Sequence, residues 1–230
     1  MDQLSTPTVS ADVAQRLRGL IHGGHLGPGD RLPPERELAK QMGVGRVSIR
    51  EALRLLQATG YVDVRRGASG GTFITALDRP YEDWVRRMRE SVDEVNDILD
   101  LRIGLEGRAA TLAAHRRSDE QLAAMATAIE ELSSADSRMS FRNSDARFHS
   151  ALAQASGSKR LEVAIGQARG EMFAPVDQGG FTEVIETSRA AHAAIYEAIR
   201  DRDPQRASQA MEAHLEETRG ELTELIFGER

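Results

Sequence analysis

Apolar residues early in the chain recur at the spacing of two short helices. One set of four falls at i, i+3, i+4 and i+7 and so predicts the buried face of a helix: Ile49, Ala52, Leu53 and Leu56. Leu38, Ala39 and Met42 predict a shorter helix before it. Gly43 and Gly45 lie between the two helices and favour a tight turn. Two short helices joined in this way form a helix-turn-helix.

After Gly60 the spacing of apolar residues changes from that of a helix to the alternation of strands. The segments YVDV and GGTFI flank Arg65, Arg66 and Gly67. This order predicts two short strands joined by a glycine-containing loop. A hairpin that follows a helix-turn-helix is the wing of a winged helix-turn-helix, which we expect over residues 1–76.

The rest of the chain carries helical patterns almost throughout. We expect a linker over residues 77–83, which contains Pro80, and a bundle of six or seven antiparallel helices over residues 84–230. Several apolar stripes mark these helices, and the first of them consists of Ile98, Leu101, Leu105 and Leu112. The predicted fold class is therefore mainly α, with a small β-hairpin wing in the N-terminal domain and an all-α C-terminal domain.

Local start and stop signals support the division of the bundle into helices. Ser118 followed by Gln121 resembles a capping box. Asp203 before Pro204 combines a favoured N-cap with proline at the first helical position. A break between two helices is expected at Pro175, which precedes a pair of glycines.

The formal net charge of −6 hides an uneven distribution of charge. The first 78 residues carry ten Lys/Arg against eight Asp/Glu, whereas the remainder carries twenty against twenty-eight. A polyanionic partner is therefore expected at the N-terminal domain. The chain has no cysteine, no apolar run of membrane-spanning length and no signal-peptide pattern at its N-terminus. We expect a cytoplasmic protein without a membrane partner.

Arginines lie beside the apolar face of the second helix of the helix-turn-helix. Arg46 and Arg50 fall near its N-terminus, where a long forked donor can reach the acceptor pair of guanine in the major groove. The alternative is a solvated arginine face on an ordinary helical domain. The turn, the wing and the charge distribution together favour double-stranded DNA. The residues expected to contact it are Arg36, Arg46, Ser48, Arg50, Arg65, Arg66 and Gly67.

Four polar residues are expected to face the interior of the bundle from three helices. Asp145 and His149 are four residues apart, and His192 and His214 each lie on the apolar face of another helix. Buried unpaired groups of this kind are costly, so they satisfy one another, a ligand or a metal. Three imidazoles and a carboxylate suit a divalent ion such as Zn, Ni or Mn. The alternative is a hydrogen-bonded polar cluster without a metal.

Arg102 and Glu106 form an i, i+4 pair beside the apolar stripe of the first bundle helix. As an exposed ion pair they would contribute little to stability. If they face the cavity, Arg102 is placed to hold the carboxylate of a small organic acid. The other histidines, His22, His25 and His115, fall at helix ends or turns and are expected to be ordinary surface residues.

The segment PGDRLPPERELAKQMGVGRVSIREALRLLQATGYVDVRRGASGGTFI resembles the GntR family of bacterial transcriptional regulators. Three later segments are similar to the FadR C-terminal domain (FCD), a ligand-binding module: LRIGLEGRAATLAA, DARFHSALAQASGS and AAHAAIYEAIRDRDPQRASQAMEAHL. Gly45 departs from the family pattern, since relatives often carry Ser or Thr there. By position, the resemblance implies DNA contacts at Arg36, Arg46, Arg50 and Gly67 and metal ligation by Asp145, His149, His192 and His214. It thus favours the metal over the metal-free cluster.

The resemblance also implies a homodimer that binds a near-palindromic operator and changes its DNA affinity when an organic acid binds. We therefore expect a ligand-responsive transcriptional regulator, a repressor, and not an enzyme. One alternative is a metal-dependent hydrolase fused to a DNA-binding domain, since an Asp/His₃ site can lower the pKa of bound water. Another is a dimerisation bundle that holds neither ligand nor metal.

Overall fold

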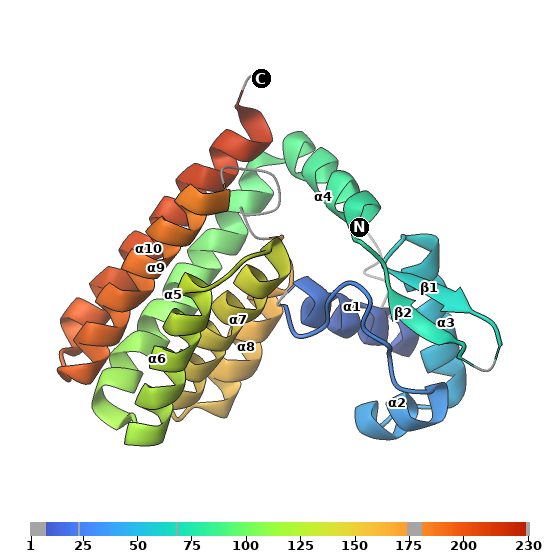
Figure 1. Cartoon of the computed structure of the whole chain (residues 1–230), viewed down its shortest axis with the longest axis horizontal. Coiled ribbons are helices and arrows are strands. Elements are labelled where there is room, and N and C mark those ends of the chain that lie inside the picture. Colours follow the sequence, from blue (N-terminus) through green and yellow to red (C-terminus); the bar gives the residue numbers. More distant parts are fainter. Residues whose placement is uncertain (1–7, 23, 68, 174–180, 229–230) are drawn as a thin grey trace, which may run out of the picture.

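The computed structural model describes residues 8–22, 24–67, 69–173 and 181–228, in which ten helices and two strands follow one another (Figure 1). A winged domain lies on one side of the molecule and a set of long helices on the other. The prediction of a mainly α chain is confirmed. The elements are α1 (Val9–His22), α2 (Glu35–Met42), α3 (Arg46–Ala58), β1 (Val62–Arg65), β2 (Gly71–Ile74), α4 (Asp78–Glu90), α5 (Val92–Arg116), α6 (Asp119–Ser133), α7 (Arg138–Ala155), α8 (Lys159–Arg169), α9 (Phe181–Arg200) and α10 (Pro204–Phe227).

Helices α2 and α3 form the predicted helix-turn-helix. Gly43 closes α2 with a φ of 69°, a left-handed conformation that glycine adopts without steric cost. The strands β1 and β2 pair antiparallel, with Val62 opposite Ile74 and Arg65 opposite Gly71, so the predicted wing is present. The buried residues of α3 are those of the predicted stripe, namely Ile49, Ala52, Leu53 and Leu56.

Helix α5 is the centre of the bundle and packs against α7, α8, α9 and α10. Small side chains allow this close packing, because α5 turns a run of fully buried alanines inward: Ala109, Ala110, Ala113 and Ala114. Within the described residues, no helix is long and apolar enough to cross a membrane.

The predicted helix starts are present. The hydroxyl of Ser118 accepts a hydrogen bond from the backbone N–H of Gln121, whose side chain accepts one from the backbone N–H of Ser118. The carboxylate of Asp203 accepts from the backbone N–H of Arg206 and caps α10 in a similar way. The break expected at Pro175 lies outside the described residues.

The segment expected as a linker over residues 77–83 is helical from Asp78 onward, which corrects that prediction. Pro80 falls in the first turn of α4, where its missing N–H costs no intrahelical hydrogen bond. Helix α4 is amphipathic and buries Tyr81, Trp84 and Met88. The proline suggested a break in the chain but marks a helix start. The domain boundaries themselves stay a prediction.

Helix α5 is also rotated relative to the predicted apolar stripe. Leu101 is 51% exposed, whereas Leu99 is completely buried. Arg102 and Glu106 lie on the buried face instead of beside it. Because the two charged side chains pair with each other and with polar groups of the bundle, α5 can turn them inward.

One apolar core continues from the winged domain into the bundle of the same chain. It joins Leu17 and Ile21 of α1 to Trp84 of α4 and to Phe173, which follows α8. The indole Nε1–H of Trp84 also donates to the backbone carbonyl of Glu171 at 3.2 Å. The winged domain is therefore held against its own bundle through α1 and α4 (Figure 1).

Two glycines allow α1 to approach the end of α8. A Cβ at Gly170 would lie 2.4 Å from the Cα of Gly19, a distance that backbone atoms do not tolerate. Among the described residues, the nearest neighbour of a Cβ at Gly19 would be the Cα of Gly170, at 3.8 Å. The space is thus needed at position 170 and not at position 19.

Gly170→Ala is expected to lower the free energy of unfolding by about 1–3 kcal/mol, because its methyl group would push α1 away from α8. Gly19→Ala is the matched control. It is expected to be neutral or stabilising by up to ~1 kcal/mol, since alanine is the better helix former. Urea unfolding of the full chain measures both. Wild-type stability in the Gly170 variant would contradict the close approach.

Candidate metal centre and nucleic-acid interface

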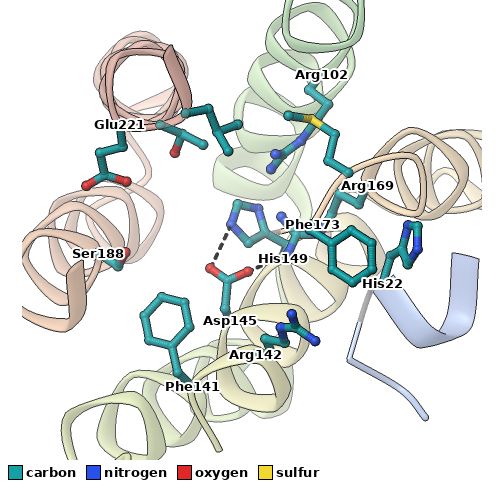
Figure 2. A pocket seen from close by; sticks show the side chains of 13 residues that line it. His22, Arg102, Phe141, Arg142, Asp145, His149, Arg169, Phe173, Ser188 and Glu221 are labelled. Atoms are coloured by element: carbon teal, nitrogen blue, oxygen red, sulfur yellow. Dashed lines mark hydrogen bonds and ion pairs between the residues drawn. The ribbon is translucent and has the colours of Figure 1, made fainter. Parts of the chain in front are cut away.

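A polar cavity lies inside the bundle beside α1 (Figure 2). Helices α5, α7, α8, α9 and α10 contribute to its wall, together with the last residue of α1. Phe141, Met172 and Phe173 form part of an apolar side. The charged and polar lining consists of His22, Arg102, Arg142, Asp145, His149, Arg169, Ser188, Thr218 and Glu221. Three arginines share this small space with the carboxylates of Asp145 and Glu221, so the lining carries charges of both signs.

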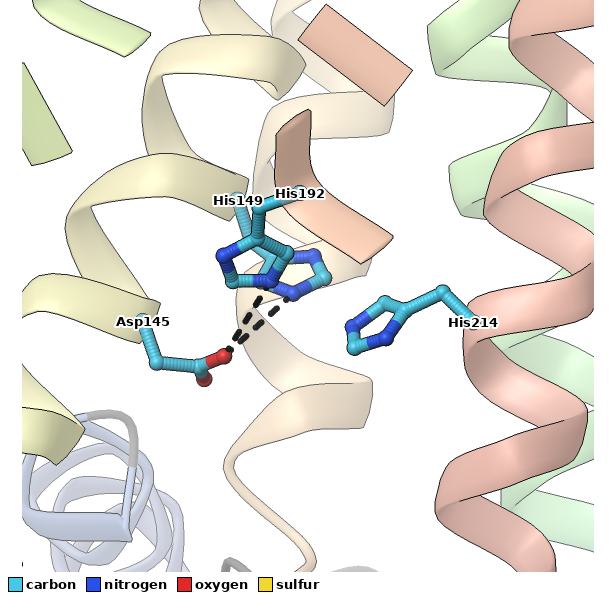
Figure 3. A group of neighbouring side chains, drawn as sticks. All are labelled: Asp145, His149, His192 and His214. Carbon is cyan, nitrogen blue, oxygen red and sulfur yellow. Dashed lines mark ion pairs between the residues drawn. The ribbon is translucent and has the colours of Figure 1, made fainter. Parts of the chain in front are cut away.

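The four polar residues expected to face the interior do meet at one point (Figure 3). Asp145 and His149 project from α7, His192 from α9 and His214 from α10. One ligand atom from each residue lies within 4.8 Å of the others. Three helices far apart in the sequence thus supply one set of metal-type ligands.

Burial and charge set the protonation states of this cluster. Desolvation lowers the pKa of His214 to about 3 and lowers the pKa values of His149 and His192 as well. Burial alone would raise the pKa of Asp145, but Arg169, whose Nη2 donates to its Oδ2 at 2.5 Å, holds it well below its usual range. Neutral imidazoles and an ionised carboxylate are the forms that bind a metal.

Unpartnered nitrogen atoms in the cluster favour a metal over a hydrogen-bonded polar group. In the part of the chain that the structure describes, the Nε2 atom of His149 and both ring nitrogens of His192 are buried without a hydrogen-bond partner. The Oδ1 atom of Asp145 lies 3.7 Å from the first of these histidines and 3.5 Å from the second, and it satisfies neither. Since buried polar nitrogens are normally paired, these residues fit a divalent cation.

Glu106 fixes the orientation of His149. It is completely buried, accepts the Nδ1–H of His149, and accepts from Nε of Arg102 at 2.8 Å. Burial alone would raise the pKa of Glu106, but the charge of Arg102 and the hydrogen bond from His149 hold it well below its usual range. With Nδ1 as donor, the lone pair of Nε2 is free for the cluster. Arg102 lines the cavity, whereas Glu106 contacts the ligand histidine. Their role in effector binding stays a prediction.

Sequence patterns did not identify two arginines of the cavity. Arg169 lies in the last turn of α8, where a basic residue usually complements the helix terminus, so its position gave no signal. Arg142 lies three residues before Asp145 and on the same face of α7, so helical spacing could have found it. Its guanidinium lies 5.3 Å from the ring centroid of Phe173.

His22 was expected on the surface, and that prediction was wrong. Its ring lies 4.2 Å from that of Phe173, and its Nε2 is 2.9 Å from the hydroxyl of Tyr61. Burial lowers the pKa of His22 to about 3, so the ring is neutral. The bundle covers this end of α1, which the pattern of α1 alone does not reveal. His25 and His115 are exposed as expected.

The predicted reading arginines lie on the surface of the winged domain. Arg46, Arg50 and Arg36 are exposed and Ser48 is partly buried. The Nε and Nη2 atoms of Arg50 donate to the two carboxylate oxygens of Glu35 at 3.2 and 3.0 Å. The hydrogen bond from Arg50 holds the pKa of Glu35 below its usual range.

The wing presents its predicted residues to solvent as well. Arg65, Arg66 and Gly67 are all exposed. The guanidinium of Arg65 lies 4.5 Å from the ring centroid of Phe73. Gly67 has a φ of 107°, which other residues rarely adopt, so the tip needs glycine here. The predicted contacts with DNA are therefore accessible, and their roles stay a prediction.

Comparisons with known proteins match both halves of the chain. The profile of the FCD domain matches residues 97–217, and that of the bacterial regulatory proteins of the gntR family matches residues 9–74. The chain is 30% identical over 224 residues to the HTH-type transcriptional regulator RmpR of Mycobacterium gastri, which covers 94% of this chain and 81% of the relative. It is 31% identical over 223 residues to the HTH-type transcriptional repressor NanR of Klebsiella aerogenes, with coverages of 92% and 84%.

Among solved structures, E. coli McbR/YncC has a TM-score of 0.55 at 20% identity, over 96% of this chain and 99% of that chain, and thus shares its fold. The relatives named here are transcriptional regulators, and nothing in these comparisons supports the hydrolase alternative. The chain therefore belongs to the gntR family of bacterial regulatory proteins and carries an FCD domain, which makes it a DNA-binding transcriptional regulator and not an enzyme.

Proposed function

We propose that this chain is a repressor whose operator affinity is set by a small organic acid bound at a metal centre in the bundle. The observation that carries this proposal is the cavity, because Asp145 and His149 of the cluster, Arg102, and His22 of the winged domain all line it. Residues 1–76 would read DNA, residues 77–83 would join the domains, and residues 84–230 would sense the effector and dimerise.

The DNA partner is a near-palindromic operator bound by a homodimer. A recognition helix meets base edges through its N-terminal residues, which is where Arg46 and Arg50 lie in α3. Two such helices related by a twofold axis match the two halves of a palindrome. Since DNA is the partner, we infer a cytoplasmic location. Phosphate, base-edge and minor-groove contacts are assigned to Arg36, Ser48, Arg65, Arg66 and Gly67.

The metal would be held by Asp145, His149, His192 and His214, and the ligand types suit Zn, Ni or Mn. When bound, the ion supplies positive charge and open coordination positions for an anionic oxygen. The chain itself orients one of the ligands. Glu106, which lies outside the cluster, accepts a hydrogen bond from the imidazole of His149 and so fixes the direction of this ring.

The effector is a small carboxylate that also carries hydroxyl groups. Arg102 uses its Nε–H for Glu106, which leaves its terminal N–H groups for a carboxylate. Arg142 adds positive charge to the lining of the same cavity. Ser188 and Glu221 lie on the other side of the cavity (Figure 2) and can exchange hydrogen bonds with hydroxyls. Hydroxy acids and sugar acids have this combination of groups.

Coupling requires that effector and operator prefer different arrangements of the two domains. His22 supports this, since it lines the cavity and its Nε2 lies within hydrogen-bonding distance of the Tyr61 hydroxyl, three residues beyond α3. An effector that displaces the ring of His22 would break its contact with Tyr61 and so change the packing beside the recognition helix α3. By linkage, operator binding must alter effector affinity by the same factor.

Arg46→Ala and Arg50→Ala are each expected to weaken operator binding roughly tenfold to a hundredfold and to relax base preference. Fluorescence anisotropy measures this, with a duplex that the wild-type chain has selected from a random pool. Arg108→Ala removes the same charge from an exposed position of α5 and should bind normally. Unaltered affinity in both reading-helix variants would show that the reading surface lies elsewhere.

Elemental analysis of the purified full chain is expected to find about one Zn, Ni or Mn ion per chain. His192→Ala should lose the ion, because it removes one of the four ligand residues and this ligand is completely buried. His115→Ala, which removes an exposed imidazole, should keep it. If wild-type protein takes up no divalent ion even when one is added, the metal assignment is wrong.

A thermal-shift screen should identify a hydroxy acid or sugar acid that stabilises the chain, by about 2.7 kcal/mol at a hundred times its Kd. Arg102→Lys keeps the charge but loses the fork, so it should weaken this ligand roughly tenfold. Arg108→Lys is the control. The same ligand should lower operator affinity. An operator Kd indifferent to every ligand that binds the bundle would refute the coupling.

A further inference from the structure

A carboxylate lies on the surface that is to meet the polyanion. Glu35 is the first residue of α2, and its side chain is 31% exposed beside the N-terminal turns of α3. Both of its oxygens accept from one guanidinium, since Nε and Nη2 of Arg50 lie 3.2 and 3.0 Å away. Nη2 of Arg46 is 3.9 Å from the same carboxylate. A negative charge in this place opposes phosphate binding, so its presence calls for a reason.

Helix capping alone does not explain this carboxylate. An acidic residue in the first turn complements the positive end of a helix, but Glu37 already lies in that turn of α2. Glu37 is exposed and, among the described residues, accepts a hydrogen bond from Gln41 of its own helix alone, at 3.3 Å. Glu35 alone of the two reaches across to α3. Glu35 therefore differs from Glu37 in its two hydrogen bonds with Arg50.

Glu35 binds only one edge of the Arg50 guanidinium, so a second edge can still donate hydrogen bonds. Arginine has five N–H donors, and the carboxylate takes the Nε–H and one N–H of Nη2. The remaining N–H of Nη2 and one N–H of Nη1 point away from the stem of the side chain. This end-on pair matches the O6 and N7 acceptors of guanine. A free arginine must also give up rotamer freedom when it binds, whereas a held one has already done so.

We infer that Glu35 is a positioning residue that sets the base selectivity of this regulator, because it holds Arg50 with its end-on edge presented to guanine. The same charge weakens binding that depends on phosphates alone. Glu35 therefore raises the ratio of operator binding to sequence-independent binding in two ways. This inference rests on the proposed reading role of Arg50.

Glu35→Gln keeps the size of the side chain and removes its charge and its two-point grip. The full-length variant is measured with the duplex selected by the wild-type chain and with a scrambled duplex of the same composition. Binding to the scrambled duplex should tighten, and the ratio of the two affinities should fall roughly tenfold. Glu37→Gln removes the same charge from the same turn and should leave the ratio close to that of the wild type.

A base analogue separates positioning from general effects on fold. Replacing each operator guanine in turn by 7-deazaguanine removes the N7 acceptor. At the guanine read by Arg50, the wild-type chain should lose affinity and Glu35→Gln should lose markedly less. A merely structural effect of the substitution would weaken binding to both duplexes and would not depend on one base.

The outcomes distinguish this inference from the proposed function. If Arg50→Ala loses selectivity while Glu35→Gln changes the ratio no more than Glu37→Gln, the positioning role is wrong and the reading role stands. An equal penalty from 7-deazaguanine in wild type and Glu35→Gln also overturns the inference. If Arg50→Ala keeps full selectivity, the reading role fails and the inference fails with it.

Discussion

Burial of ionisable groups inside an apolar bundle is the constraint on which the sensing half of this molecule depends. A charge in such an interior is tolerated only when it is paired, and loss of one partner costs about 3–5 kcal/mol. Arg102 pairs with Glu106, which in turn holds His149, and Arg169 pairs with Asp145. Two cations and two carboxylates therefore balance within one small volume.

The histidine nitrogens that take no part in these ion pairs are as informative as the pairs themselves. The two ion pairs satisfy Arg102, Glu106, Arg169 and Asp145. The ring nitrogens of His192 and the Nε2 of His149 find no hydrogen-bond partner among the described residues. A hydrogen-bonded cluster built for stability would have satisfied them. Burying these nitrogens without a partner costs free energy, and a divalent cation that accepts their lone pairs would offset this cost. The cluster therefore fits a metal site better than a metal-free polar cluster.

Local patterns in the sequence predicted the elements that depend on local physics. The stripe of α3, the wing and the cap at Ser118 are fixed by residues a few positions apart, and all are present. Spacing also predicted the four candidate ligands, since an inward position on a helix follows from its period. Each of these inferences needed only one element at a time.

The error at Pro80 was local, because a proline at a helix start was interpreted as a break. The other failures concern contacts between elements. The exposure of Leu101 depends on what packs against α5. Arg169 reaches Asp145 from another helix, twenty-four positions away. His22 is covered by residues that follow α8, far along the chain. A pattern within one helix carries no information on such partners, so only the assembled fold reveals them.

The same long-range contacts give the two halves a physical means to influence each other. The Phe173 ring faces the guanidinium of Arg142 at 5.3 Å and the ring of His22 at 4.2 Å. His22 is neutral and meets the hydroxyl of Tyr61, so this contact does not change with pH near neutrality. If an anion binds in the cavity as proposed and draws Arg142 toward it, the contact of Arg142 with Phe173 weakens. Because packed rings shift between discrete arrangements more readily than they deform, a small change at the cavity can alter the support of α3.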